Sequence, residues 1–364
     1  MIPIAKPIIG EKEKELVAEV LNTGMLAQGP KVKEFEQRFA ELCGIKHAVA
    51  VNSGTAALHS CVYAAGIRPG DEVITVPFTF VATVNPIIMQ GAKPVFVDVR
   101  EDTFNIDSDS VLDKITPKTK AIIAVDLYGQ VYDYPAIKEI ADDHKLMLIE
   151  DAAQAVNALL GDKKAGNFGD LASFSFYATK NMITGEGGIV ATENDEYAEL
   201  AKRFRHHGQS EKTRYEYYNL GYNYRMMDLQ AAIGLGQLDK IREYTERRIE
   251  IAEELNTGLK DIEGIKIPFV KPNAKHVYHQ YTIKVDGFKL SRQDLAGYLK
   301  KNGIGCGIYY PKPLHLHPHF RKFGYKKGDF PVAERLSKQV ISLPVHPSLS
   351  APDVKEIIKV IKNA

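Results

Sequence analysis

Lys180 is the residue of this 364-residue chain that points most directly to chemistry. It ends the run SFSFYATK at residues 173–180 and precedes the glycine-rich run GEGG at residues 185–188. A lysine amine forms a Schiff base with an aldehyde when a rigid pocket fixes its geometry and eases its deprotonation. Most lysines are instead solvated surface groups. Lys180 is therefore a hypothesis that needs support from other residues.

A carboxylate, Asp151, follows the apolar run at residues 146–149. If that run is a buried parallel strand, Asp151 lies at its carboxyl end, where open α/β sheets form their ligand crevices. An ionised aspartate there could keep a pyridinium nitrogen protonated, and the protonated ring would then withdraw electrons from a carbanion. The alternative is that Asp151 caps a helix, with Glu150 as a solvated neighbour.

The segment VNSGTAAL at residues 51–58 places small polar residues where a strand turns into a helix. Unpaired backbone amides and the helix dipole would converge there, and such a point binds phosphate well. The alternative is that Ser53 or Thr55 is only an N-cap. The run GEGG is not a dinucleotide fingerprint, because it precedes a predicted strand rather than opening a helix.

These three features supply anchors for the phosphate, the ring nitrogen and the aldehyde carbon of one molecule, pyridoxal phosphate. Each feature is common by itself, whereas their combination in one chain is much more specific. The sequence therefore predicts a pyridoxal phosphate site that requires all three segments to meet.

Short apolar runs alternate with amphipathic segments from His47 onward, which predicts a parallel sheet covered by helices on both faces. The runs at 171–177 and 189–192 are joined without a helix, so we expect a mixed, mostly parallel sheet. One long helix is predicted from Met227 to Leu255. We expect a large α/β domain with the N-terminal segment at residues 1–250 and a smaller α+β domain at residues 251–364.

Composition restricts the partners to small molecules. The chain carries 47 basic and 46 acidic residues and a formal charge of +1, which gives no electrostatic footprint for nucleic acid or a membrane surface. No apolar run is long enough to span a bilayer, and prolines interrupt the N-terminal residues before a signal peptide could form. Three scattered cysteines indicate neither a disulfide framework nor a zinc site. We expect a cytoplasmic protein without a metal, since His315, His317 and His319 resemble a metal cluster only in number.

From about Ile4 to its C-terminus the chain resembles the sugar aminotransferases of the DegT/DnrJ/EryC1/StrS family, within the aspartate aminotransferase fold type I. The resemblance is carried, in order, by NSGTAAL at 52–58, EDAAQA at 150–155, SFSFYATKN at 173–181, GEGG at 185–188 and GYNYRM at 221–226. It implies an enzyme that depends on pyridoxal phosphate.

The resemblance also implies a role for each matching residue. Lys180 matches the lysine that binds the cofactor aldehyde and then moves the proton. Asp151 matches the partner of the ring nitrogen, and Gln154 the group near the phenolic oxygen. The matches to phosphate contacts are Gly54, Thr55, Ser175 and Asn223, the last supplied in the family by the neighbouring subunit. Phe80 matches the aromatic residue that stacks on the ring, with an ordinary core aromatic as the alternative.

The reaction implied is transfer of an amino group, expected from L-glutamate, to the keto carbon of a nucleotide-linked keto-sugar by a homodimer with shared active sites. Relatives that dehydrate sugars replace the lysine with histidine, whereas this chain keeps Lys180. An amino-acid aminotransferase of the same fold, which would need an arginine clamp for a carboxylate, is one alternative. A non-catalytic cofactor- or sugar-binding regulator is another. Asn157, Ala178 and Asp126 depart from the residues common in the family, and we expect Asp126 to affect a pocket wall.

Overall fold

The structure is a computed structural model that describes residues 1–210, 213 and 215–364. Within these residues the largest sheet has seven strands in the order β1-β9-β8-β5-β4-β2-β3. Six strands run parallel and β9 alone is reversed. The strands are β1 (His47–Val51), β2 (Glu72–Thr75), β3 (Lys93–Phe96), β4 (Thr119–Val125), β5 (Met147–Asp151), β8 (Leu171–Ser175) and β9 (Gly188–Thr192). The predicted mixed, mostly parallel sheet is confirmed.

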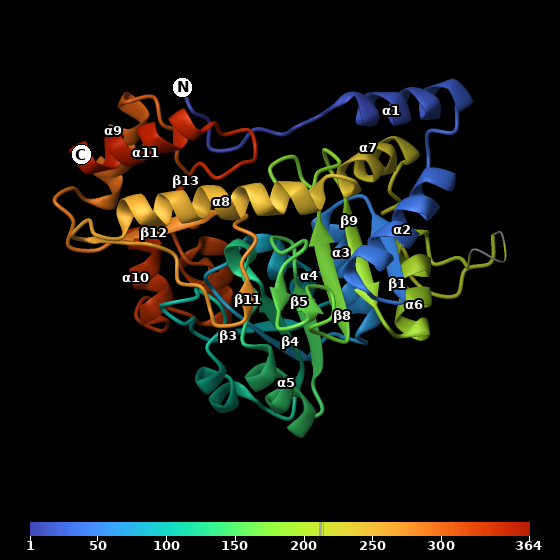
Figure 1. The fold of residues 1–364 in the computed structure, drawn as a ribbon. Helices are drawn as coiled ribbons and strands as arrows, with labels where there is room; N and C mark the ends of the chain where they lie inside the picture. Colours follow the sequence, from blue (N-terminus) through green and yellow to red (C-terminus); the bar gives the residue numbers. More distant parts are fainter. Residues whose placement is uncertain (211–212, 214) are drawn as a thin grey trace.

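Helices cover both faces of this sheet (Figure 1). They are α1 (Glu11–Thr23), α2 (Pro30–Cys43), α3 (Gly54–Ala64), α4 (Asn85–Met89), α5 (Tyr134–Asp143), α6 (Asp195–Arg205) and α7 (Asp228–Leu238). Because side chains alternate across a strand, Ala50 belongs to one apolar core while Val49 and Val51 belong to the other. Phe35, Phe39 and residues of β8 fill the first core, and α3 packs against β8 and β9 in the second.

A smaller α+β unit follows in the chain. It contains α8 (Ile241–Leu259), β10 (Ile265–Lys266), β12 (Tyr281–Val285), α9 (Arg292–Lys301), α10 (Pro331–Gln339), β13 (Val340–Leu343) and α11 (Ala351–Asn363). Strands β10, β12 and β13 form an antiparallel sheet. A third apolar core, whose first fully buried residue in the chain is Ile251, fills this unit. Residues such as Phe320 and Leu336 instead join a core of the large sheet. A third sheet joins β6 (Leu159–Leu160), β7 (Lys163–Lys164) and β11 (Ala274–Lys275).

The predicted single helix from Met227 to Leu255 is wrong. The structure has two helices, and α7 ends at Leu238 while α8 begins at Ile241. The two intervening residues are held by the N-terminal helices: Asp239 pairs with Arg38 at 2.6 Å, and Lys240 pairs with the buried Glu13 at 2.7 Å. These tertiary ion pairs hold the chain where an apolar pattern alone predicts a continuous helix. Helix α8 then crosses the molecule with the large sheet on one side and α9 and α11 on the other (Figure 1).

Short 3-10 helices occupy several connections: η1 (Val81–Thr83), η2 (Ser108–Ser110), η3 (Leu112–Lys114), η4 (Leu127–Gly129), η5 (Leu314–Leu316) and η6 (Pro318–Phe323). Two of them matter for function, because η1 and η4 follow β2 and β4 at the carboxyl edge of the sheet. Among the described helices, none is both long enough and apolar enough to cross a membrane.

Candidate active site

A cavity of about 510 Å³ opens at the carboxyl edge of the large sheet. This volume lies within the range of small-molecule sites. Its walls come from the ends of β4, β5 and β8, from the start of α3 and from the segments at residues 279–280 and 309–310. All but one of the residues predicted from the sequence line it, namely Gly54, Thr55, Phe80, Asp151, Gln154, Ser175 and Lys180.

Lys180 stands on the loop between β8 and β9. The loop is fixed because the Thr184 amide donates to Phe176 O at 2.8 Å and the Phe176 amide donates to Gly187 O at 2.9 Å. The Lys180 side chain is partly buried, and its Nζ donates no hydrogen bond within the described chain. Burial lowers the pKa of Lys180 to about 8, while the negative charge of Asp151 opposes the shift. A sizeable fraction of this amine is therefore neutral, and able to act as nucleophile or base, near physiological pH.

Asp151 is buried at the end of β5, with 4% of its surface exposed. Its Oδ2 accepts from Thr83 Oγ1 at 2.8 Å, and its Oδ1 accepts from the Ala153 amide at 3.2 Å. Burial raises the pKa of Asp151, whereas these two donors and Lys180 lower it. Among the residues that the structure describes, no cationic group contacts this carboxylate directly, so it can receive a protonated ring nitrogen from a ligand.

The start of α3 forms a cradle for an anion. Ser53 caps the helix by accepting from the Ala56 amide at 3.1 Å, and within the described chain the Gly54 and Thr55 amides donate to no other group. A Cβ on Gly54 would lie 2.6 Å from Ser175 Cβ, so only glycine lets the helix approach the end of β8 this closely. Free amides, a helix N-terminus and the Ser175 hydroxyl thus face one end of the cavity.

The glycine-rich run behind Lys180 has a packing role. Gly188 is the first residue of β9, and a Cβ there would lie 2.5 Å from Ser53 O. A Cβ on Gly187 would lie 2.3 Å from Thr184 Oγ1. These glycines bring the lysine loop and the anion cradle together.

Phe80 and Tyr310 are two of the aromatic residues that line the cavity. The Phe80 side chain is 54% exposed and lines the cavity, so Phe80 is not the ordinary core aromatic offered as the alternative. Its ring stacks against Tyr310 with 6.2 Å between centroids. Gln154 accepts from the Tyr128 amide at 2.8 Å and donates to the Tyr310 hydroxyl at 3.4 Å, which fixes the amide orientation.

Asn223 is the predicted site residue that does not line the cavity. It is exposed, and its carbonyl accepts from Asn52 Nδ2 at 3.3 Å. Arg225, a neighbour on the same segment, donates to His206 Nδ1 at 2.7 Å and also lies outside the cavity.

Sequence reasoning missed Thr83 and His279. Thr83 lies in η1, 68 residues before Asp151, so no local pattern predicts the hydrogen bond between them. His279 lines the cavity beside Lys180; burial lowers its pKa well below the usual value, and its Nδ1 has no hydrogen-bond partner in the described chain. Asp126, which was expected to affect a pocket wall, is fully buried and does not itself line the cavity, whereas its neighbour Val125 does.

Within the described residues no group of three or more His, Cys, Asp or Glu side chains could hold a metal ion. His315 pairs with Glu334 at 3.0 Å instead.

Comparison with known proteins decides the family. Residues 7–362 match the DegT/DnrJ/EryC1/StrS aminotransferase family. The chain belongs to this family. It is 43% identical to the spore coat polysaccharide biosynthesis protein SpsC of Bacillus subtilis, over 100% of this chain and 96% of that one. It is 37% identical to GDP-perosamine synthase of Caulobacter vibrioides, over 98% and 96% of the two chains. The PLP form of Spr1654 from Streptococcus pneumoniae superposes with a TM-score of 0.94 at 31% identity, over 100% and 98% of the chains.

The protein is a pyridoxal-phosphate-dependent aminotransferase of fold type I, as the sequence predicted. Its cavity fits the cofactor in three independent respects. The close approach of Gly54 to Ser175 leaves free amides for a phosphate, the buried Asp151 has no direct cationic partner in the described part of the chain, and the Lys180 amine is available for the aldehyde.

Proposed function

We propose that the protein transfers an amino group from L-glutamate to the keto carbon of a nucleotide-linked keto-sugar, working in the cytoplasm as a homodimer. The observation that carries the proposal is the convergence of Lys180, Asp151 and the start of α3 on one cavity. Support for a sugar comes from GDP-perosamine synthase, whose name specifies a nucleotide sugar product.

The polar groups of the cavity also favour a sugar. Hydroxyl and amide side chains line it, among them Thr79, Thr179 and Gln280, and no arginine of the described chain does so. Sugar hydroxyls are well matched by such groups, whereas an amino-acid aminotransferase is expected to offer an arginine clamp for a carboxylate.

Each protein group has a task in this chemistry. Bound pyridoxal phosphate supplies an aldehyde carbon and a conjugated ring that accepts the electron pair left when a substrate carbon loses its proton. The cradle of Gly54, Thr55 and Ser175 would hold the phosphate, and Phe80 would lie against the ring. Asp151, held by Thr83, would keep the ring nitrogen protonated. Lys180 Nζ, whose pKa is lowered to about 8, would accept the proton that leaves the substrate carbon.

The test of function is release of 2-oxoglutarate from L-glutamate in the presence of each member of a panel of nucleotide keto-sugars. We expect one or a few keto-sugars to support turnover and Lys180→Ala to abolish it. Lys355→Ala, an exposed substitution on α11, serves as the control and should keep full turnover. Turnover with 2-keto acids alone, and with no keto-sugar, would point to an amino-acid aminotransferase instead.

Asn223 supplies a test of the homodimer. If Asn223 completes the partner's cavity, mixing Asn223→Ala with Lys180→Ala subunits creates one intact site in each mixed dimer. A one-to-one mixture should then regain about a quarter of the wild-type activity by random pairing. If mixed dimers form but stay inactive, Asn223 does not act across the interface.

A further inference from the structure

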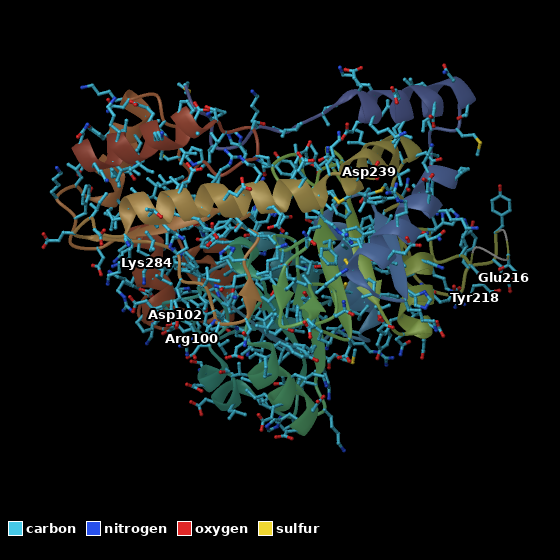
Figure 2. The ribbon with its side chains drawn as sticks, viewed as in Figure 1. Arg100, Asp102, Glu216, Tyr218, Asp239 and Lys284 are labelled. Atoms are coloured by element: carbon cyan, nitrogen blue, oxygen red, sulfur yellow. The ribbon has the colours of Figure 1, made fainter. Side chains whose placement is uncertain are left out.

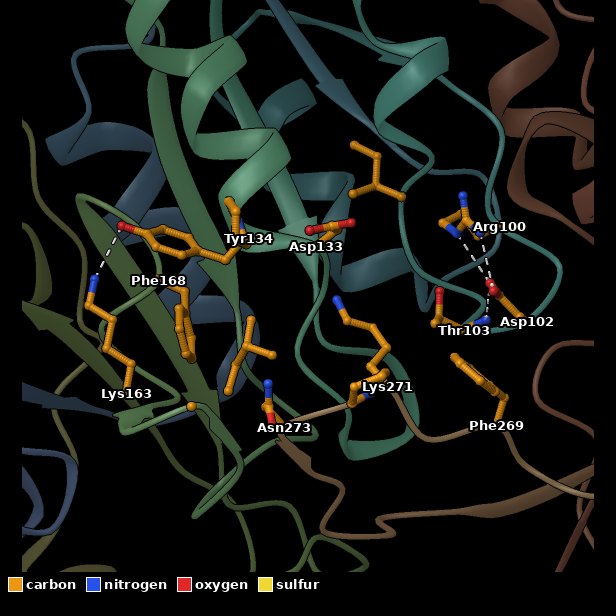
Figure 3. A pocket seen from close by; sticks show the side chains of 15 residues that line it. Arg100, Asp102, Thr103, Asp133, Tyr134, Lys163, Phe168, Phe269, Lys271 and Asn273 are labelled. Carbon is orange, nitrogen blue, oxygen red and sulfur yellow. Dashed lines mark hydrogen bonds and ion pairs between the residues drawn. The ribbon is translucent and has the colours of Figure 1, made fainter.

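A second cavity, of about 680 Å³, lies outside the active site. It opens between the segment that follows β3, the start of α5 and the segment before β11 (Figure 3). Arg100 and Asp102, which line it, lie far from Tyr218 at the opposite end of the molecule (Figure 2). The other residues used below are Asp133, Lys163, Phe269 and Lys271.

Lys271 is the unusual residue of this cavity. Its side chain extends into the middle of the lining residues, toward Asp133 (Figure 3). The Nζ atom is buried and has no hydrogen-bond partner within the described chain. Burial lowers the pKa of Lys271 and outweighs the opposing effect of Asp133, the first of the nearby carboxylates. Asp133 is too far away to form an ion pair with this ammonium group, so Lys271 can take an anionic partner that enters the cavity.

The neighbouring cations are already engaged. Arg100 donates from Nε and Nη2 to the two Asp102 oxygens, each at 3.2 Å, and Lys163 donates to the Tyr134 hydroxyl at 3.2 Å. Helix α5 points its N-terminus at the cavity without a side-chain cap, which adds partial positive charge. Among the described cations that line this cavity, Lys271 is therefore the one whose side-chain nitrogen has no hydrogen-bond acceptor.

Apolar side chains line the same cavity. The Phe269 side chain is 46% exposed, and Ile106, Leu160 and Phe168 also face the cavity. An exposed aromatic face and an unpaired cation in one cavity suit a ligand that has a flat ring and an anionic group.

Hydrogen bonds through Gln130 connect this cavity to the segment that lines the active site. Gln130 Nε2 donates to Phe269 O at 3.1 Å, and the Lys271 amide donates to Gln130 Oε1 at 2.7 Å. Two residues earlier, the Tyr128 amide donates to Gln154 Oε1 at 2.8 Å, and both of these residues line the active-site cavity. A ligand bound to Phe269 and Lys271 would therefore contact residues that are hydrogen-bonded to Gln130, two residues from the lining of the cofactor pocket.

We propose that this cavity is a second binding site, for a small molecule that places a phosphate or carboxylate on Lys271 and a flat ring against Phe269. The volume admits a nucleoside monophosphate or a smaller aromatic carboxylate, which share this chemistry. The site is independent of the identity of the amino acceptor, so it does not depend on the keto-sugar assignment.

Calorimetric titration of the cofactor-loaded enzyme tests the site with three probes: uridine monophosphate, benzoate and uridine. Lys271→Met removes the charge but keeps the length of the side chain, and Lys355→Met is the matched control on an exposed lysine. We expect Lys271→Met to weaken the anion that occupies the site by about tenfold or more, as loss of a charge-assisted hydrogen bond implies. Uridine, which has no anionic group, should bind weakly to both proteins. The anion whose affinity falls in Lys271→Met is the kind of ligand that the site binds.

Binding in the active site remains intact in Lys271→Met, so it contributes equally to both titrations. Phe269→Ser, at an exposed position, is the second variant and should weaken the same anion if Lys271→Met fails to fold. Superimposable titrations of the wild type and the variants with both anions would refute the second site and restrict any binding to the active-site cavity.

Discussion

Gly54→Ala isolates the close packing that creates the phosphate cradle. The new Cβ would lie 2.6 Å from Ser175 Cβ and 2.9 Å from its Oγ, whereas ordinary contacts begin at 3.4 Å. The two carbons must therefore separate by about 0.8 Å. Ser175 sits in the buried strand β8 and cannot easily move, so α3 must shift and the cradle must open.

The expected effect has two measurable parts. Overpacking of this size lowers the free energy of unfolding by about 1–3 kcal/mol. Displacement of the Gly54 and Thr55 amides should also weaken cofactor binding by about tenfold, measured by titrating the apoenzyme with pyridoxal phosphate and following absorbance. Ser175→Gly in the same chain removes the colliding atoms and should restore much of the stability, less about 0.5–1 kcal/mol for a glycine in a strand.

Gly297→Ala is the control, for which the free energy of unfolding is expected to change in the opposite direction. Gly297 lies within α9, and a Cβ there would meet no atom within 4 Å. Alanine should stabilise the helix by about 0.5–1 kcal/mol and leave cofactor affinity unchanged. If Gly54→Ala were as stable as the wild type and bound the cofactor equally well, or if Ser175→Gly gave no rescue, the cradle argument would be wrong.

Three further predictions concern charged groups. Reductive methylation of Lys180 in the apoenzyme, measured by peptide mass spectrometry, should increase with pH through a midpoint near 8. Asp151→Asn should lower this midpoint, because the negative charge of Asp151 raises the pKa of Lys180. Thr83→Val removes a donor to a buried carboxylate, so turnover or cofactor affinity should fall by a factor equivalent to about 1.5–3 kcal/mol; unchanged kinetics would exclude a role for this hydrogen bond. Lys240→Met leaves Glu13 buried without its cation and should lower the free energy of unfolding at neutral pH by about 3–5 kcal/mol. Because Lys240 lowers the pKa of Glu13, the wild-type advantage over this variant should shrink as pH falls through that pKa, and a pH-independent difference in denaturant titrations would contradict the pairing.

Local sequence was sufficient for the elements that mount the site. Strands β5 and β8 are apolar runs flanked by turn residues, and their ends carry Asp151 and the loop to Lys180. The start of α3 could also be predicted, because its small polar residues follow a buried strand. Asn157 shows how a departure from the family pattern is absorbed: its φ is +69°, in the left-handed region that asparagine tolerates better than most residues, so the usual glycine is not required.

Contacts between distant segments could not be read in this way. The break between α7 and α8 depends on Glu13 and Arg38, about 200 residues earlier in the chain. The Thr83 hydrogen bond to Asp151 and the orphaned ammonium of Lys271 likewise arise where separate connections meet.

The sequence by itself determined the α/β class, the alternation of strands and helices through the large sheet and the residue types able to hold an aldehyde, a ring nitrogen and a phosphate. It did so because burial periodicity and turn chemistry act over a few neighbouring residues. The tertiary structure decided which of those residues share a cavity, how burial lowers the pKa of Lys180, and where a second cavity leaves a charge unpaired. Those properties depend on desolvation and packing between segments far apart in the chain, which no local pattern encodes.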